Sequence, residues 1–190
     1  MSGVLQTLRR SWPALGLPLV LIVVALVGAR WFAPETAASR LLDTPAPAFS
    51  LPIVAGAGAA QHDRLALDSL RGQVVVLDFW ASWCPPCRQS VPILDRVHRS
   101  QGAHHVRVIG INLEPDLAPA AVAAVHRRLG ASYPTLQDRT GETQQAYGIE
   151  QLPTLVVIGA DGMVRHVETG VPDEDRLHSK ILSLLGGLGR

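Results

Sequence analysis

The sequence predicts an α/β fold, in which helices flank a central β-sheet. The first observation behind this prediction is an apolar run at residues 74–80, rich in the β-branched, aliphatic and aromatic residues of a strand buried on both faces. The second is that strand-like and helix-like segments alternate after this run. The third is the turn signal Asp161-Gly162, which precedes a returning strand and an amphipathic helix at 173–185. Together they predict an α/β sandwich closed by a hairpin and a helix.

The buried strand leads directly into a pair of cysteines. Residues 74–91 have the sequence VVVLDFWASWCPPCRQSV, in which Pro85 and Pro86 separate Cys84 from Cys87. Both prolines are compatible with the first turn of a helix, where the backbone amide hydrogens have no partner. We therefore predict that the strand delivers the two cysteines to the start of a helix.

This placement predicts redox chemistry at the two cysteines. Unpaired amide hydrogens and the positive end of the helix dipole favour a thiolate at Cys84, which makes it the candidate nucleophile. Cys87, one turn further, can attack a mixed disulfide at Cys84 and release the reduced substrate. The alternatives are a purely structural disulfide and half of a metal site, although zinc would need further ligands and the chain has no third cysteine. We predict a redox-active Cys84–Cys87 disulfide, with no metal and no other cofactor.

The other elements follow from hydrophobic patterning and turn residues. Strands are expected at 49–54, as an edge strand, and then at 65–67, 106–113, about 134–136, 154–158 and 163–167. Helices are expected after the dithiol as far as Val97, and then at 119–129, about 141–147 and 173–185. The helix at 119–129 is rich in alanine, and Gly130 suits its end.

The amino-terminal segment predicts a membrane anchor. Residues 11–29 contain no charged side chain, and with their flanks they are long enough to cross a bilayer. Trp12 at one end and Trp31 at the other would lie at the two membrane interfaces. A cleaved signal peptide is the alternative, because Val27-Gly28-Ala29 would suit a peptidase that needs small residues. Both interpretations export the dithiol.

These features divide the chain into four parts. We predict a cytoplasmic end at 1–10, a transmembrane signal anchor at 11–33, an extended tether rich in alanine and proline at 34–46, and a folded domain at 47–190. The formal net charge of +1 gives no indication of a nucleic-acid partner. The seven histidines are scattered, and none lies between the two cysteines, so we expect them to be solvated at the surface.

Two motifs make the chain similar to proteins of the thioredoxin superfamily. Residues 77–87, LDFWASWCPPC, resemble the dithiol motif of the family, and residues 147–154, YGIEQLPT, resemble its second signature. Residues 114–137 occupy the place of the helical insert of the membrane-anchored TlpA/ResA-like branch, and the resemblance extends over residues 45–185. It implies a thioredoxin-like fold, with a central mixed sheet flanked by helices and an extra helical insert.

The resemblance also assigns roles to residues of this chain. It implies that Cys84 is the exposed attacking thiol, that Cys87 is the buried one, and that Pro153 is a cis proline facing the dithiol. The backbone of Leu152 would then pair with a strand of the substrate. The residues expected to contact the substrate are Trp83, Pro85, Pro86, Leu152 and Pro153.

Asp78 is a carboxylate within an otherwise apolar strand, which is costly unless the group is neutral, paired or used. Burial would raise its pKa, so that it could take the proton of Cys87 when this thiol attacks the mixed disulfide. It matches the buried acid of thioredoxin, and we assign it a catalytic role; a strand-end Asp that reaches water is the alternative. TlpA/ResA-like proteins commonly carry a Glu where this chain has Ser90, and Glu150 is a candidate replacement, although we expect it to be exposed.

We therefore predict an enzyme, a thiol:disulfide oxidoreductase that reduces disulfides of exported proteins. The resemblance implies apocytochromes c or copper-centre proteins as clients, and a membrane thiol protein of the DsbD or CcdA type as the electron donor. It also implies a single-pass protein of the bacterial inner membrane whose folded domain faces the periplasm. One alternative is a disulfide oxidase or isomerase, which would differ in its reduction potential. A Cu(I) chaperone is an alternative of another class, although such carriers usually have a wider cysteine spacing and a distant His.

Overall fold

The computed structural model describes residues 20–25, 37–56, 63–101 and 105–186. Met1–Glu35 and Thr36–Arg190 form two separate units. In the first unit, residues 20–25 are helical. No helix within the described ranges is both long and apolar enough to cross a membrane. The predicted cytoplasmic end at 1–10 and most of the predicted anchor at 11–33 lie outside the described residues.

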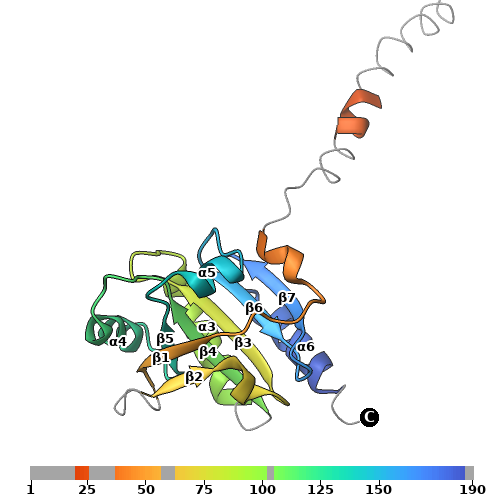
Figure 1. Cartoon of the computed structure of the whole chain (residues 1–190). Coiled ribbons are helices and arrows are strands. Elements are labelled where there is room, and N and C mark those ends of the chain that lie inside the picture. The colour runs from red at the N-terminus through yellow and green to blue at the C-terminus, as the bar shows by residue number, and fades with distance from the viewer. Residues whose placement is uncertain (1–19, 26–36, 57–62, 102–104, 187–190) are drawn as a thin grey trace, which may run out of the picture. The chain divides into compact units, whose positions relative to one another are not determined.

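The described part of the second unit contains a seven-stranded mixed sheet in the order β2-β1-β5-β4-β3-β6-β7 (Figure 1). Its strands are β1 (Ser50–Ala55), β2 (Arg64–Ala66), β3 (Val74–Trp80), β4 (Val106–Asn112), β5 (Thr135–Gln137), β6 (Thr154–Ile158) and β7 (Val164–Thr169). β3 pairs in parallel with β4 and antiparallel with β6, and β4 pairs in parallel with β5. The predicted mixed sheet is therefore confirmed. The prediction of an edge strand at 49–54 is wrong, because β2 folds back on β1 and itself forms the edge.

Helices cover both faces of this sheet. They are α3 (Cys87–Gln101), α4 (Pro119–Arg128), α5 (Glu142–Ala146) and α6 (Glu174–Leu185), together with the 3-10 helices η1 (Ala37–Leu41) and η3 (Leu67–Leu70). The side chain of Asp173 accepts a hydrogen bond from the amide of Arg176 at 2.9 Å and so caps the start of α6. The four predicted helices are thus present, with ends that differ from the predicted ones by a few residues.

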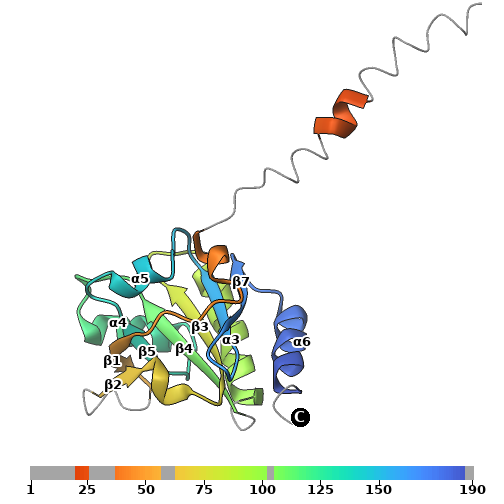
Figure 2. The same cartoon turned by 45° about the vertical axis from the view of Figure 1, so that its right-hand side comes forward.

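The alternation of side chains along β3 separates the core into two layers. Val74 and Val76 pack with apolar residues of α3 and α6, which lie on one face of the sheet (Figure 2). Val75, Leu77 and Phe79 point to the other face, where Phe79 packs against the ring of Tyr147. Every residue of β3 is buried, as predicted for a strand with both faces covered. Asp78 and Trp80 continue the row of Val74 and Val76, on the face that α3 covers.

Residues 37–46 do not form the extended tether predicted at 34–46. Ala38, in η1, is 2 % exposed within the core. The amide of Asp43 donates to the carbonyl of Val164 at 2.8 Å, and Pro45 forms a β-bridge with Met163. This packing is possible because Ala38 is small and apolar, and because backbone groups of residues 163 and 164 are available to pair with residues 43 and 45. The segment is therefore part of the folded unit.

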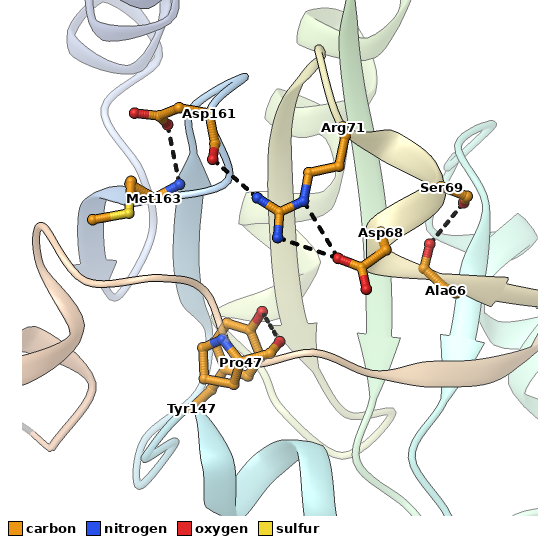
Figure 3. A network of polar contacts seen from close by, with 8 residues as sticks. All are labelled: Pro47, Ala66, Asp68, Ser69, Arg71, Tyr147, Asp161 and Met163. Carbon is orange, nitrogen blue, oxygen red and sulfur yellow. Dashed lines mark hydrogen bonds and ion pairs between the residues drawn. The ribbon is translucent and has the colours of Figure 1, made fainter.

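Arg71 connects η3 to the turn between β6 and β7 (Figure 3). Its guanidinium donates to Oδ1 of Asp68 at 3.2 Å and to the carbonyl oxygen of Asp161 at 2.9 Å. In the same view, the hydroxyl of Tyr147 donates to the carbonyl of Pro47 at 2.8 Å. The Arg71–Asp68 ion pair is exposed and lies within one segment, so it contributes little free energy. The hydrogen bond to the Asp161 carbonyl is the contact that connects the two surface segments.

Gly110 lies at the centre of the sheet, opposite Asp78 of β3 and Thr135 of β5. A Cβ atom at this position would overlap the hydroxyl of Thr135. It would also lie 3.1 Å from Nε1 of Trp80 and 3.3 Å from the ring of Tyr133. The site therefore has no room for a side chain, since three neighbouring side chains already fill the space.

We expect Gly110→Ala to lower the free energy of unfolding by about 1–3 kcal/mol, because a well-packed core must shift to admit the methyl group. Urea denaturation measures this change. The control is Gly186→Ala, at φ −63°, where the nearest atom would be 3.6 Å from the new Cβ; this variant should change stability by less than about 0.5 kcal/mol. Equal stability of the two variants would contradict the packing described at Gly110.

Candidate active site

The parallel strands β3 and β4 end at the same edge of the sheet, where the dithiol lies. Trp80, the last residue of β3, is in register with Asn112, the last residue of β4. The chain then turns from Trp80 through Ala81 and Ser82 to Cys84, and α3 begins at Cys87. The carboxyl ends of two strands and the amino end of a helix therefore meet at the cysteine pair.

Cys84 and Cys87 form a disulfide. The backbone amide of Cys87 donates to Sγ of Cys84 at 3.2 Å, so an amide at the start of α3 is directed at this sulfur. The carbonyl of Pro86 accepts hydrogen bonds from the amides of Gln89 and Ser90, which begin the helix. The predicted position of the cysteines at a helix start is confirmed. An amide at 3.2 Å favours a negative charge on the Cys84 sulfur once the disulfide is reduced.

The exposed thiol implied for Cys84 is not found in the disulfide form. Cys84 is 2 % exposed and Cys87 is fully buried. Both pack in one cluster with Trp80 and with Val122 of α4. The exposed residues at this site are instead Trp83, which is 67 % exposed, and Pro85.

The other predicted substrate contacts lie around the disulfide. Leu152 is half-buried against the cluster that contains the two cysteines. The Leu152–Pro153 peptide bond is cis, in agreement with the resemblance, and Pro153 is buried. Pro86 is half-buried beside the exposed Pro85. Trp83 borders an open depression of about 390 Å³ that residues 113–117 line on the other side.

Glu114 holds the segment that leads to the cysteines. Its carboxylate accepts hydrogen bonds from the amide of Ser82 at 2.6 Å and from the Ser82 hydroxyl at 2.7 Å. The side-chain amide of Asn112 donates to the same carboxylate at 2.9 Å. Charge-assisted bonds of this kind fix the backbone of Ser82 immediately before Trp83 and Cys84.

Asp78 is buried, with 1 % of its surface exposed. Burial raises its pKa to about 7, and a hydrogen bond from the hydroxyl of Tyr133, at 2.9 Å from Oδ2, opposes this rise. Its other oxygen, Oδ1, has no hydrogen-bond partner among the described residues. The side chain therefore lies inside the protein and does not reach water at a strand end.

His126 does not fit the expectation that the histidines are solvated. It is 1 % exposed, stacks on Trp80 with 5.5 Å between the ring centroids, and shares a 2.8 Å hydrogen bond with the hydroxyl of Thr135. Burial lowers its pKa to about 4, against a smaller opposing effect of Asp95, so the ring is neutral at neutral pH. The expectation failed because the alanine-rich helix α4 directs His126 inwards. His62 and His104 lie outside the described residues.

Sequence reasoning did not identify Glu114 or Tyr133 as residues of the site. The signal for Glu114 was available, because it follows the polar Asn112 at the end of a strand parallel to β3. Tyr133 gave no such signal, since it lies in a short segment before β5. Ser90 is buried and donates to the carbonyl of Cys87 at 3.1 Å, whereas Glu150 is exposed, as expected.

A mixed sheet with two redox-capable cysteines at the start of a helix is the arrangement of enzymes that exchange disulfides. By class, the protein is a thiol:disulfide oxidoreductase. The chain belongs to the Redoxin family, whose family model matches residues 42–185. The resemblance to TlpA/ResA-like proteins of the thioredoxin superfamily is therefore confirmed.

Individual relatives support the same class. The chain is 34% identical to the thiol:disulfide interchange protein DsbE of Allochromatium vinosum over 165 residues, which cover 87% of this chain and 86% of the relative. It is 28% identical to the thiol-disulfide oxidoreductase ResA of Geobacillus thermodenitrificans over 171 residues, 87% of this chain and 92% of that protein. A crystal structure of a thiol:disulfide interchange protein of the thioredoxin family from Chlorobium tepidum matches with a TM-score of 0.64 and 28% identity, over 76% of this chain and 97% of that one. The thioredoxin-like α/β fold is thus confirmed.

We expect Asp78→Asn to become more stable relative to the wild type as pH rises. The folded-state pKa of Asp78, about 7, exceeds the ordinary value of 3.8, so the folded chain binds more protons than the unfolded chain between these values. Stability supplied by this proton is lost as pH rises through about 7. The stability difference between variant and wild type should grow by roughly 2–4 kcal/mol between pH 4 and pH 8 in urea denaturation of the oxidised protein.

Asp95→Asn is the control of opposite sign. Burial raises the pKa of Asp95, but hydrogen bonds from Ser132 and the charge of Arg99 together lower it below the ordinary value. This variant should therefore lose stability relative to the wild type as pH rises. The opposing titration of His126 cancels in the difference between Asp78→Asn and the wild type, because Asp78 is not among the groups that shift the pKa of His126. If the effect of Asp78→Asn on stability did not change with pH, the carboxyl of Asp78 would have its ordinary pKa in the folded protein, which would contradict the prediction.

Proposed function

We propose that this oxidoreductase reduces disulfides of exported proteins, and that residues 11–33 anchor it in the bacterial inner membrane with the folded unit on the periplasmic side. The observation that best supports dithiol–disulfide exchange at neutral pH is Asp78, a buried carboxyl on the α3 face whose pKa of about 7 suits a proton acceptor. The reducing direction follows from the resemblance to TlpA/ResA-like proteins. The similarity to DsbE and ResA proteins supports the same class of reaction.

The reaction would proceed in two displacements. The Cys84 thiolate, stabilised by the amide of Cys87, attacks one sulfur of the client disulfide, so that a mixed disulfide forms and the first client thiolate leaves. Cys87 then gives its proton to the Asp78 carboxylate and attacks the Cys84 sulfur. The Cys84–Cys87 disulfide forms, and the second client thiolate leaves. The client gains two electrons and the enzyme dithiol loses two.

A second dithiol must reduce the enzyme again. We propose a membrane thiol protein of the DsbD or CcdA type as this donor, on the basis of the resemblance alone. The same resemblance suggests apocytochromes c or copper-centre proteins as clients, since their cysteines must be reduced before a cofactor is attached. Both assignments follow from the family and not from a residue of this chain.

The surface around the disulfide suits an extended client segment. Trp83 and Pro85 are exposed beside the buried sulfurs, and Leu152 is half-buried against the cluster that contains the two cysteines. Aromatic and proline side chains at an exposed site supply apolar contact for a client chain, and the backbone of Leu152 would pair with it, as the resemblance implies. Contact between client and enzyme would therefore centre on Trp83, Pro85, Pro86, Leu152 and Pro153.

We expect Cys87→Ser to accumulate a mixed disulfide with a disulfide-bonded client peptide, because the resolving thiol is absent. Cys84→Ser should form no such adduct and should abolish peptide reduction, since Cys87 is fully buried. Mass spectrometry of the non-reduced reaction mixtures measures both outcomes. Adducts that form equally in the two variants would contradict the assignment of Cys84 as the attacking thiol.

The reduction potential distinguishes a reductase from an oxidase or isomerase. For a reductase we expect a value on the order of −250 mV or lower, in the range of thioredoxin, when the chain is equilibrated with a glutathione or dithiothreitol series. A value near about −120 mV, typical of strong periplasmic oxidants, would contradict the proposal and make the protein a disulfide donor.

A further inference from the structure

Tyr133 and Asp78 form a buried pair beneath the active site. The phenol is fully buried, Asp78 is 1 % exposed, and the hydroxyl of Tyr133 donates to Oδ2 of Asp78 at 2.9 Å. Asp78 comes from β3, whereas Tyr133 comes from the segment between α4 and β5, 55 residues further along the chain. The helical insert thus contributes a side chain directly to the carboxyl that lies on the α3 face.

The backbone on both sides of Tyr133 is held in place. The amide and hydroxyl of Ser132 donate to Oδ1 of Asp95, in α3, at 2.7 and 2.6 Å. The carbonyl of Pro134 accepts a hydrogen bond from the amide of Gly110, in β4, at 2.9 Å. Because α3 and β4 fix the residues before and after Tyr133, the phenol is positioned before any reaction begins.

The position of the Tyr133 ring also depends on the space that Gly110 leaves in the sheet by having no side chain. Gly110 is in register with Asp78, so it is the residue of β4 nearest to the carboxyl. A Cβ atom at Gly110 would lie 3.3 Å from Cε2 of Tyr133, a tighter contact than an ordinary one. The absence of a side chain at this position therefore lets the ring of Tyr133 approach Asp78.

The two oxygens of Asp78 have different surroundings. Oδ2 accepts the hydrogen bond of Tyr133, and Oδ1 has no partner among the described residues. A proton taken from Cys87 can therefore reside on Oδ1 while Oδ2 keeps its bond to the phenol. We propose that Tyr133 is a positioning residue that sets the proton affinity of Asp78 and, through it, the pH dependence of disulfide exchange at Cys87. This inference rests on the proposed role of Asp78 as the proton acceptor.

Other titratable groups face the pair from each element packed around it. α4 contributes His126, whose ring meets that of Tyr133 edge-on at 4.9 Å, and α3 contributes Asp95 and His98. His126 has a pKa lowered to about 4 by burial, and the hydrogen bonds of Ser132 and the charge of Arg99 keep the pKa of Asp95 low despite its burial. Burial lowers the pKa of His98, and burial together with Asp78 raises the pKa of Tyr133 well above its usual range. Asp78 is therefore the carboxyl of this cluster whose pKa is raised, to about 7.

The first test follows the Asp78 carboxyl by ¹³C NMR in the oxidised, full-length chain in detergent, with Asp78→Asn to assign the signal. Tyr133→Phe removes the donor, so the titration midpoint should rise by about one pH unit. A ring-fluorinated tyrosine at Tyr133 is a stronger donor and should lower the midpoint. An unchanged midpoint in both proteins would overturn the inference.

Tyr147→Phe is the matched control. It removes another buried phenolic hydroxyl, which donates to the carbonyl of Pro47 at 2.8 Å in the opposite core layer (Figure 3). The loss of one hydrogen bond should cost similar stability in both variants, as urea denaturation measures. The Asp78 midpoint should nevertheless stay at its wild-type value in Tyr147→Phe. If the Asp78 midpoint shifted equally in Tyr147→Phe and Tyr133→Phe, the shift would result from loss of stability in general, and the inference would be overturned.

The second test measures the rate at which each reduced chain reduces a disulfide-bonded peptide between pH 5 and pH 9. The rise of this rate with pH should move up by about one unit in Tyr133→Phe, so that this variant is about tenfold slower at pH 6, and should stay in place in Tyr147→Phe. If the wild-type chain reduces the peptide but the pH–rate profile of Tyr133→Phe is not shifted, this inference is overturned and the proposed function is not. A wild-type chain that does not reduce the peptide overturns the proposed function, while the NMR titration still decides whether Tyr133 controls Asp78.

Discussion

The burial of one carboxyl inside β3 is the constraint around which the active site is built. A strand that is covered on both faces has no water to solvate Asp78, so the group must be neutral, hydrogen-bonded or both. The fold provides one donor, the hydroxyl of Tyr133, and leaves the second oxygen unpartnered among the described residues. An unpartnered buried oxygen on Asp78 lowers the stability of the fold, but it leaves an atom beneath the dithiol that can accept a proton.

The disulfide and its surroundings depend on the parallel pairing of β3 with β4. This pairing brings the ends of both strands to one edge, so Glu114 after β4 can hold Ser82 after β3. The start of α3, which follows β3 in the chain, lies against the Cys84 sulfur through a local hydrogen bond. Buried apolar residues of α3 and α6 then keep the helix on the sheet. The hydrogen bonds around the cysteines and the packing of α3 on the sheet therefore both depend on the position of β3.

The sequence predicted the features that periodicity and motif spacing encode. The strand before the cysteines, the helix after them, the closing hairpin and the buried position of Asp78 each have a local signal, and each is present. Residues whose position depends on distant partners were missed. Tyr133 and His126 become part of the site only because α4 and the following segment bring them against Asp78 and Trp80 of β3. Residues 37–46 have the composition of a linker, and only their contacts with β7 place them in the folded unit.

The close contact between Gly110 and Tyr133 implies that these two positions cannot vary independently. Any side chain at position 110 would compete for the space that the phenol and the Thr135 hydroxyl occupy. A descendant that gained a side chain there would have to shorten residue 133 or 135 in the same step, or lose the donor to Asp78. The space around Gly110 therefore makes the sizes of residues 110, 133 and 135 mutually dependent, and with them the donor to Asp78.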